Sequence, residues 1–313
     1  MGACKCPPYD DDARACTPGR PSNMKIHLND FRISARKQID LAKWPTDIKP
    51  LYPSEKHYKE RLARDAAELG DLQRVLYATG SYAMLLIFQA MDAAGKDGAI
   101  SHVLSGVHPQ GCVVHDFKHP SAEELTHDFL WRTTRQLPAR GMIGVFNRSY
   151  YEEVLVVREH HAMLLTEKIP DEKGHDKAVW KGRYRSIVEL EQHLHRNGTR
   201  IIKFFLHLSK EEQRKRFLAR IDEPDKNWKF SEADVTERTF WDQYARLYED
   251  CLCATSTKVA PWHVVPADDK LNARLIIARI VIDALKGLDL SYPKSSPERQ
   301  RQLLAVRKKL MAE

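Results

Sequence analysis

Short, wholly apolar segments alternate with longer amphipathic segments along most of the chain. Residues 83–88 form a continuous apolar run, which is typical of a strand buried on both faces of a parallel sheet. Before this run, apolar residues recur at helical spacing from Ser54 to Thr79, and Gly80 follows directly. The pattern therefore predicts a helix over 54–79 that ends at Gly80, followed by a buried strand.

The same alternation continues to the end of the chain. Strands are predicted at 83–88, 112–117, 142–147, 200–208 and 262–265. Helices are predicted at 54–79, from the loop 89–96 to about 105, and at 121–137, 149–158, 178–196, 209–221, 271–285 and about 297–311. Five strands, each followed by a helix, predict a three-layer α/β/α fold with a five-stranded, mostly parallel sheet.

The pattern also predicts how the chain is divided. Residues 1–23 are short of apolar side chains and rich in turn formers, so we expect a disordered tail there. Residues 24–290 read as one domain with a helical N-terminal extension, and residues 291–313 as a separate polar C-terminal helix.

Composition narrows the class of protein. The chain has 313 residues, of which 42% are hydrophobic and 30% charged, and its mean hydropathy is −0.52. Its longest apolar runs fall far short of the roughly 20 residues that a membrane-spanning helix needs, and the first residues offer no apolar signal-peptide stretch. We therefore expect no membrane partner. The formal net charge of +7 is too small to identify a partner by itself.

The six cysteines lack the paired spacing, and the nearby histidines, of a zinc site or a disulfide framework. They are Cys4, Cys6, Cys16, Cys112, Cys251 and Cys253. A reduced, cytoplasmic protein fits this pattern best.

The segment between the first predicted strand and its helix has the form of a phosphate-binding loop. Gly95 and Lys96 match the pattern G-x-x-x-x-G-K-[S/T], whereas Ala90 stands at the first glycine and Asp97 at the magnesium-binding hydroxyl. In such loops the backbone N–H groups and a helix N-terminus hold an anion, and the lysine adds its charge. The predicted phosphate-binding residues are Met91, Ala93, Ala94, Gly95, Lys96, Asp97 and Gly98. The alternative is an ordinary strand–turn–helix with a chance Gly-Lys pair.

Other side chains must supply the oxygen ligands of a magnesium ion, because no Ser or Thr follows Lys96. Asp92 lies in the loop, the third predicted strand ends at Asn147, and Glu152 follows about one helical turn later. Arg148 emerges at the same edge of the sheet, where open α/β sheets bind their ligands. These residues are candidates for metal and phosphate binding, and the alternative for 147–153 is a turn and a helix start without chemistry.

Residues 209–232 have the composition of a cationic lid. Arg216 and Arg220 are four residues apart, so they share a helix face. Pro224 then breaks the helix, and Lys226 and Lys229 follow. Because a guanidinium binds two phosphate oxygens at once, this segment is predicted to close over a polyanion. The alternative is a solvated, charged helix.

Together these segments resemble the family-2 polyphosphate kinases. The resemblance covers roughly residues 30–290 and rests on five ordered blocks: MDAAGKDGAI, FKHPSAEELTHDFLWR, GVFNRSYYEEVLVVR, the segment from EEQRKRF to DEPDKNWKFS, and TSTKVAPWHVVPADDKLNAR. It implies a P-loop kinase fold similar to thymidylate kinase and reversible, Mg²⁺-dependent phosphoryl transfer between inorganic polyphosphate and a nucleotide. Asn147 and Glu152 within NRSYYEEVL resemble the class that accepts both nucleoside mono- and diphosphates, so AMP, ADP and ATP are the expected nucleotides, with guanine nucleotides as further candidates.

Under this resemblance the candidate residues acquire roles. Lys96 and the loop amides would hold terminal phosphates, and Asp92 and Glu152, assisted by Asn147, would hold Mg²⁺ or Mn²⁺ in its place. Arg148, Arg216 and Arg220 would stabilise charge on the transferring group. Lys118 and Arg132 would contact the nucleotide phosphate, with Asp128 either orienting Arg132 or forming a surface pair with it. The resemblance further implies a homo-oligomer, a dimer or a tetramer.

Two other functions compete with this interpretation. An ATP-dependent nucleoside monophosphate kinase would have the same fold and a different phosphate donor. A non-catalytic polyanion-binding protein would use the basic surface alone, although no helix is uniformly basic and no nucleic-acid-binding motif is present, so we expect no nucleic-acid partner.

Overall fold

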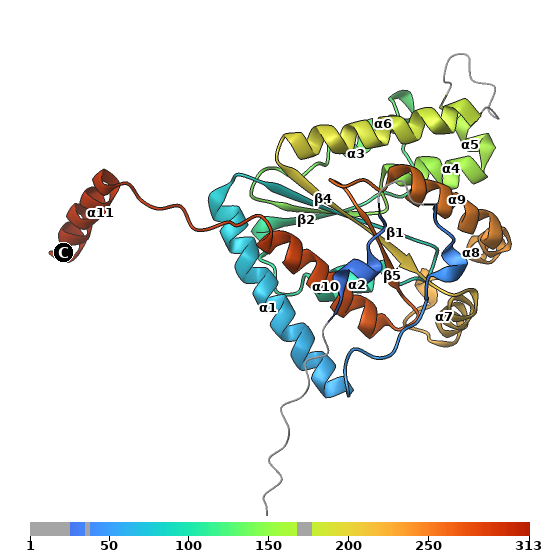
Figure 1. The fold of residues 1–313 in the computed structure, drawn as a ribbon, viewed down its shortest axis with the longest axis horizontal. Helices are drawn as coiled ribbons and strands as arrows, with labels where there is room; N and C mark the ends of the chain where they lie inside the picture. The colour runs from blue at the N-terminus through green and yellow to red at the C-terminus, as the bar shows by residue number, and fades with distance from the viewer. Residues whose placement is uncertain (1–25, 35–37, 168–176) are drawn as a thin grey trace, which may run out of the picture.

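The five predicted strands form one sheet in the computed structural model, which describes residues 26–34, 38–167 and 177–313. The strands are β1 (Ala83–Ala90), β2 (Cys112–Asp116), β3 (Ile143–Asn147), β4 (Thr199–His207) and β5 (Trp262–Pro266). Their order across the sheet is β2-β3-β1-β4-β5, and each neighbouring pair is parallel (Figure 1). All five carboxyl ends therefore lie along one edge, and the predicted fold class is confirmed.

Alternate side chains of β1 face the two sides of the sheet. Met84 and Leu86 belong to one core, and Leu85 and Ile87 belong to the other. Helices α1 (Glu55–Thr79), α2 (Lys96–Val103) and α10 (Lys270–Lys286) cover the first face. Helices α6 (Lys177–Arg196) and α9 (Trp241–Thr255), together with the 3-10 helix η5 (Tyr150–Val154), cover the second. This is why β1 is apolar at every position: both of its faces are buried.

Most predicted helices form with small shifts at their ends. Ser54 caps α1 by accepting a hydrogen bond from the N–H of His57, and Gly80 ends it in the left-handed conformation at φ 56°. Helix α7 spans Lys210–Asp222, and α11 spans Pro297–Leu310. The predicted end of α1 at Gly80 is thus confirmed, and Ser54, predicted as its first helical residue, is its N-cap.

The long helix predicted over 121–137 does not form. Only the 3-10 turn η4 (Glu124–Thr126) and the short helix α3 (Trp131–Thr134) are present in that stretch. The Oδ1 of Asp128 accepts a hydrogen bond from the N–H of Leu130, which gives the backbone a local alternative to the helix. Helical spacing in the sequence was therefore outweighed by turn chemistry.

The helix predicted over 149–158 is also wrong as a single element. It divides into η5 and α4 (Val156–Glu159), and α5 (His161–Thr166) follows. Tyr150 and Tyr151 are both buried in the second core, and the Ser149 hydroxyl accepts a hydrogen bond from the N–H of Tyr151, a local bond that competes with the start of an α-helix.

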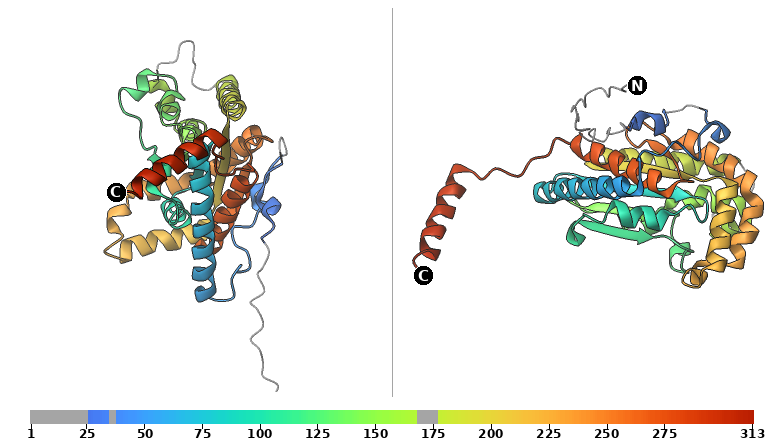
Figure 2. Two further views of the ribbon diagram at one scale, coloured as in Figure 1. Left: turned by 90° about the vertical axis from the view of Figure 1, so that its left-hand side faces the viewer. Right: turned by 90° about the horizontal axis from the view of Figure 1, so that it is seen from below.

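The remaining elements are short, apart from the terminal helix. They are η1 (Leu28–Phe31), η2 (Leu41–Lys43), η3 (Pro109–Gly111), η6 (Asn227–Lys229), α8 (Glu232–Glu237) and η7 (Arg238–Phe240). Helix α11 stands away from the rest of the molecule, and each residue from 291 to 313 is exposed (Figure 2). Among the described residues, no helix has the length and apolarity needed to cross a membrane. The predicted tail 1–23 lies outside the described residues.

Candidate active site at the carboxyl ends of the strands

The loop that follows β1 places its two left-handed residues where backbone amides can converge. Ala93 has φ 60° and Gly95 has φ 94°, and α2 begins directly afterwards at Lys96. Ala90, which stands where the phosphate-loop pattern has glycine, belongs to β1 and pairs with Leu206 of β4 in extended conformation. Alanine therefore costs nothing at position 90, and the backbone strain lies at Ala93 instead. Left-handed residues in a turn that leads into a helix are typical of loops whose backbone amides bind an anion.

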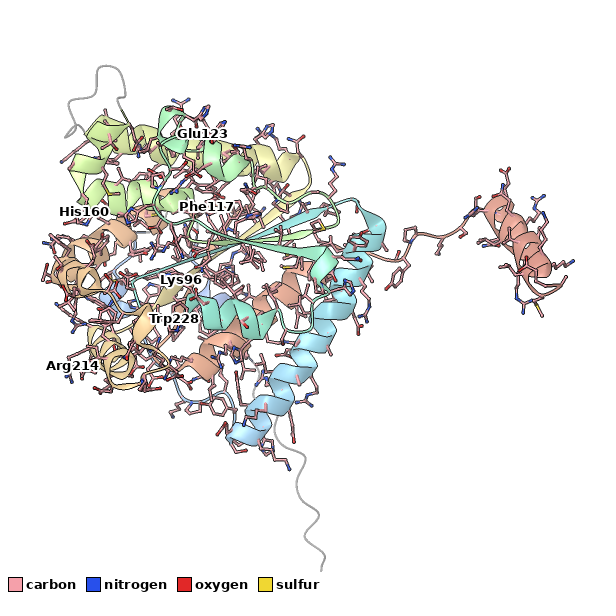
Figure 3. All side chains as sticks on the ribbon, turned by 180° about the vertical axis from the view of Figure 1, so that it is seen from behind. Lys96, Phe117, Glu123, His160, Arg214 and Trp228 are labelled. Atoms are coloured by element: carbon pink, nitrogen blue, oxygen red, sulfur yellow. The ribbon has the colours of Figure 1, made fainter. Side chains whose placement is uncertain are left out.

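Lys96 lies at the centre of the molecule, at the start of α2 (Figure 3). Its Nζ donates to the carbonyl oxygen of Ala90 at 3.3 Å. Burial, and after it the positive charge of Arg148, lowers the pKa of the Lys96 ammonium. An incoming anion would stabilise the charged form of Lys96, because a negative charge compensates for the lost hydration and for the repulsion by Arg148.

Asp92 and Arg148 meet across the loop and the end of β3. The guanidinium of Arg148 lies 3.5 Å from the Asp92 carboxylate, and both side chains remain more than one-third exposed. Arg148 has φ 63°, and its N–H donates to the carbonyl of Phe88 at 3.0 Å. A left-handed arginine directly after a buried strand is strained, and such strain persists where the surroundings fix it. Both charged groups are thus held at the rim and can reach a ligand.

Glu152 lies near Asp92, and Asn147 at the end of β3 brings a further oxygen to the same edge of the sheet. Burial raises the pKa of the Glu152 carboxyl, although the nearby Arg148 and Lys96 act in the opposite direction. The Nδ2 of Asn147 donates to Asp97 at 2.9 Å, whereas its Oδ1 is buried and has no hydrogen-bond partner among the described residues. A buried amide oxygen without a partner, on a side chain that contacts the Asp97 carboxylate, is a type of ligand that Mg²⁺ accepts. The described residues contain no cluster of three or more His, Cys, Asp or Glu that could hold a metal alone. Substrate phosphates or water would therefore have to complete the coordination.

Arg216 does not have the lid position predicted for it. Its side chain is buried, and all five of its N–H donors bind protein: Nε to Glu212, Nη1 to the carbonyls of Ala93 and Ala94, and Nη2 to the carbonyls of Ala267 and Asp268. A guanidinium has only five such donors. Arg216 therefore braces the phosphate loop from below and has no donor left for a phosphate.

The rest of the predicted lid lies at the edge of the site. Arg220 is 3.5 Å from Asp234 of α8. The pKa of the Asp234 carboxyl is raised by burial and by the nearby Asp92 carboxylate. Lys226 is exposed and pairs with Glu223, and the side chain of Lys229 lies outside the described part of the structure. Arg220 is thus a lid cation paired with a carboxylate that lies near the loop residue Asp92.

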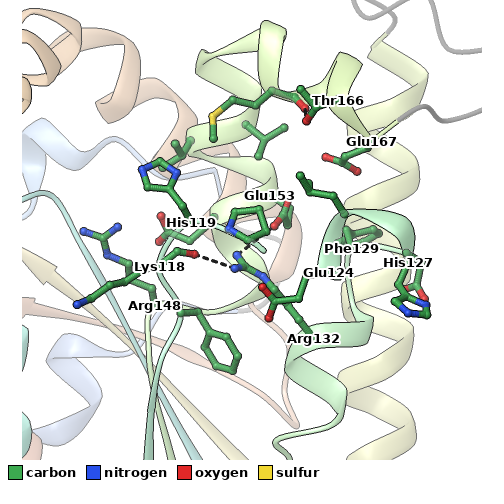
Figure 4. A pocket seen from close by; sticks show the side chains of 18 of the residues that line it. Lys118, His119, Glu124, His127, Phe129, Arg132, Arg148, Glu153, Thr166 and Glu167 are labelled. Atoms are coloured by element: carbon green, nitrogen blue, oxygen red, sulfur yellow. Dashed lines mark hydrogen bonds and ion pairs between the residues drawn. The ribbon is translucent and has the colours of Figure 1, made fainter. Parts of the chain in front are cut away.

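A cavity of about 400 Å³ opens on one side of Arg148 and Glu152 (Figure 4). Its wall includes Phe117, Lys118 and Phe129, so it combines aromatic surface with a cation. Arg132 lies at its base, where Nη1 donates to the carbonyl of Lys118 at 2.8 Å and Nη2 lies 3.3 Å from Glu153. Asp128 binds the N–H of Leu130, and the carboxylate paired with Arg132 is Glu153 rather than Asp128. The suggestion that Asp128 orients Arg132 was therefore wrong.

A second cavity, of about 550 Å³, opens on the other side of the same two residues. Asp92 and Glu152 line it together with residues of α8 and α9, among them Asp234, Tyr244 and Tyr248. Because Arg148 and Glu152 belong to both walls, the two cavities meet at the end of β3. The two cavities thus share a charged boundary at Arg148 and Glu152, and Asp92 lies in the wall of the second.

Glu153 is a site residue that the sequence reasoning missed. It pairs with Arg132 at 3.3 Å and with Arg183 at 3.5 Å, and burial, followed by the neighbouring Glu167 carboxylate, raises its pKa to about 7. The sequence Glu152-Glu153 does not show which of the two carboxylates faces the edge of the sheet, because that depends on how the short helix η5 is wound. His119, Glu237 and Tyr244 were missed as well, and they come from segments without a recognisable pattern.

Comparisons with known proteins agree with this geometry. Residues 52–293 match the family described as polyphosphate kinase 2 (PPK2). An ADP-polyphosphate phosphotransferase from Rhodopseudomonas palustris is 60% identical over 92% of this chain and its own full length. An AMP/ADP-polyphosphate phosphotransferase from Meiothermus ruber is 39% identical over 89% of this chain and its own full length. The crystal structure of polyphosphate kinase 2 from Arthrobacter aurescens TC1 is similar with a TM-score of 0.80 at 41% identity, covering 90% of this chain and 97% of that one.

Proposed function

The chain belongs to the polyphosphate kinase 2 family, and we propose that it transfers phosphoryl groups reversibly from inorganic polyphosphate to nucleoside mono- and diphosphates, converting AMP to ADP and ADP to ATP. The observation that carries this proposal is the junction of two cavities at Arg148 and Glu152, directly beside the loop lysine Lys96. When donor and acceptor are both phosphates, they must meet at one place where positive charges of the protein offset their mutual repulsion.

The acceptor needs little help from a general base. Its terminal phosphate has a second pKa of about 6, so it is mostly deprotonated at neutral pH. The barrier comes from bringing two polyanions into line, and positioning with charge neutralisation lowers that barrier. We therefore assign Asp92 and Glu152 to metal binding rather than to proton transfer.

The roles of the residues follow from where they lie. Lys96 and the loop amides hold the terminal phosphates, and Arg148 reaches the transferring group from the junction. Asp92, Glu152 and the unpartnered Oδ1 of Asn147 would hold Mg²⁺, or Mn²⁺ in its place, which when bound neutralises charge on both phosphates. Arg220 stands at the edge of the lid, where a small closing movement would bring it to the polyanion.

We assign the nucleotide to the first cavity. Phe117 and Phe129 offer apolar faces to a base, and Lys118 offers a cation at the rim. Arg132 contributes charge from beneath, since its Nε is buried without a hydrogen-bond partner among the described residues. Polyphosphate would then reach the loop from the second cavity, past Arg238 and Arg220.

The assay supplies long-chain polyphosphate and Mg²⁺ without ATP, with AMP or ADP as the sole acceptor. Formation of ADP and ATP from AMP, and of ATP from ADP, is expected. Use of ADP alone would restrict the enzyme to diphosphates, the acceptor in the name of the Rhodopseudomonas palustris relative. An arm with ATP, AMP and no polyphosphate tests the rival nucleoside monophosphate kinase, and binding of polyphosphate without transfer would support the polyanion-binding alternative.

Two further properties remain proposals. A cytoplasmic location is supported by the described cysteines Cys112, Cys251 and Cys253, which are all free thiols. The homo-oligomer rests on the family resemblance, and light scattering of the purified chain would measure it.

A further inference from the structure

A completely buried ion pair contacts η5, and neither of its residues lines either of the two cavities. The Nζ of Lys203 in β4 is 2.6 Å from the Oε2 of Glu191 in α6, and neither side chain is exposed at all. None of the catalytic roles proposed above uses this pair.

The pair and its neighbours satisfy one another. Besides Glu191, the Lys203 ammonium donates to the Tyr151 hydroxyl at 2.9 Å and to the carbonyl of Thr255 at 2.8 Å. The other carboxylate oxygen of Glu191 accepts from Tyr151 at 2.7 Å and from Tyr150 at 3.0 Å. An ammonium has three donors, so Lys203 is fully used. The cluster joins η5 to β4, α6 and α9.

Stability alone gives little reason for such a cluster. Desolvation of two charges commonly outweighs their attraction, and apolar residues of similar volume often serve as well or better. Unlike apolar packing, a hydrogen-bonded ion pair fixes the positions of specific atoms, because each hydrogen bond has a preferred distance and angle. Here the atoms fixed are the hydroxyls of two successive residues of a five-residue 3-10 helix.

Glu152 is the next residue of that helix. On its other side Glu153 is held by Arg132 and Arg183, and Arg183 also donates to the Glu153 carbonyl at 3.0 Å. The backbone of Glu152 is tied at both ends of the short helix: its N–H donates to the carbonyl of Ser149 at 3.1 Å, and its carbonyl accepts from the N–H of Leu155 at 3.2 Å. The position of the Glu152 carboxylate therefore depends on how its two neighbours are anchored.

We propose that Glu191, Lys203 and Tyr151 are positioning residues that fix η5 so that Glu152 faces the junction of the cavities. This rests on the proposed function, in which Glu152 helps to hold the divalent ion. The three residues do not touch the substrate; they act through the backbone that carries Glu152. Residues that orient a metal ligand in this indirect way commonly change metal affinity when they are replaced.

The test replaces Tyr151 by Phe, which removes one hydroxyl and leaves the Lys203–Glu191 pair in place. Tyr58→Phe is the matched control, because the Tyr58 hydroxyl is also buried and accepts from a cation, Arg274, at 3.2 Å, but lies on α1. The readouts are the Mn²⁺ dissociation constant by electron paramagnetic resonance, urea unfolding, and kcat with the KM for polyphosphate. Tyr151→Phe is expected to raise the Mn²⁺ dissociation constant roughly tenfold and to lower kcat at limiting Mg²⁺ without changing the KM for polyphosphate. Tyr58→Phe should leave the Mn²⁺ constant unchanged.

The double variant Glu191→Leu with Lys203→Met removes both charges together and covers the case in which one hydroxyl is too small a change. It is expected to fold and to show the same loss of Mn²⁺ affinity. Unchanged Mn²⁺ affinity in the double variant overturns the proposal, and so does a loss of stability alone. Glu152→Gln separates the two ideas: if it weakens Mn²⁺ binding and the other variants do not, only the positioning role fails. If Glu152→Gln leaves Mn²⁺ binding unchanged, the metal assignment of the proposed function fails, and the positioning role fails with it.

Discussion

Replacing Arg216 by lysine distinguishes two possible roles of this residue: a structural support of the phosphate loop, or an arginine finger that contacts the transferred phosphate. The substitution keeps the positive charge and the approximate length of the side chain. It reduces the number of N–H donors from five to three, so at least two of the five hydrogen bonds that Arg216 makes must be lost.

The size of the effect follows from those bonds. The bonds to the carbonyls of Ala94 and Ala267 are buried, and a buried polar group that loses its partner costs about 1–3 kcal/mol. Two such losses lower the free energy of unfolding by about 2–6 kcal/mol. Because Ala93 and Ala94 belong to the loop, activity should fall together with stability.

Urea unfolding and steady-state kinetics on the same preparations measure both effects. Arg214→Lys is the control on the same helix: Arg214 is more than half exposed, lies on the outside of α7 (Figure 3) and pairs with Glu211 three residues before it. Its substitution should change stability by less than about 0.5 kcal/mol. The reasoning is refuted if Arg216→Lys keeps the stability of the wild type and loses only kcat, which is the behaviour of a finger.

Three further substitutions test the site. Lys96→Ala should lower kcat more than about a hundredfold with the fold intact by circular dichroism, and near-normal activity would refute the phosphate-loop assignment. Glu152→Asn should reduce kcat/KM for AMP more than for ADP, and equal losses would count against a role in acceptor choice. Glu153→Gln tests the raised pKa, because between pH 4.5 and about 7 the folded protein keeps a proton that the unfolded chain releases. Relative to this variant, the wild type should therefore lose on the order of 3 kcal/mol of unfolding free energy as pH rises through that window, and parallel pH profiles would contradict the shift.

The strands, and the edge of the sheet at which the site candidates gather, could be predicted because their signals are local. A run that is apolar at every position, such as 83–88, has few alternatives to a strand buried on both faces. The carboxyl ends of parallel strands meet at one edge, so Asp92, Asn147 and Arg148 could be expected together before their distances were known.

The roles of the arginines could not be read in this way. The position of Arg216 depends on the carbonyls of two distant loops, which the spacing of charges along α7 does not reveal. The pairing of Arg132 with Glu153 depends in turn on 3-10 geometry, because an α-helix would rotate the Glu152-Glu153 doublet differently. Long-range polar contacts and the local winding of short helices were thus the missing information.

The central claim is that polyphosphate itself is the phosphoryl donor. Phosphorus NMR of the wild-type enzyme with AMP, long-chain polyphosphate and Mg²⁺, in the absence of ATP, follows donor and product together. We expect one polyphosphate unit to disappear for each new phosphoanhydride bond on the nucleotide, with ADP appearing before ATP. Intact polyphosphate and unchanged AMP, in an enzyme that still phosphorylates AMP when ATP is added, would contradict the account.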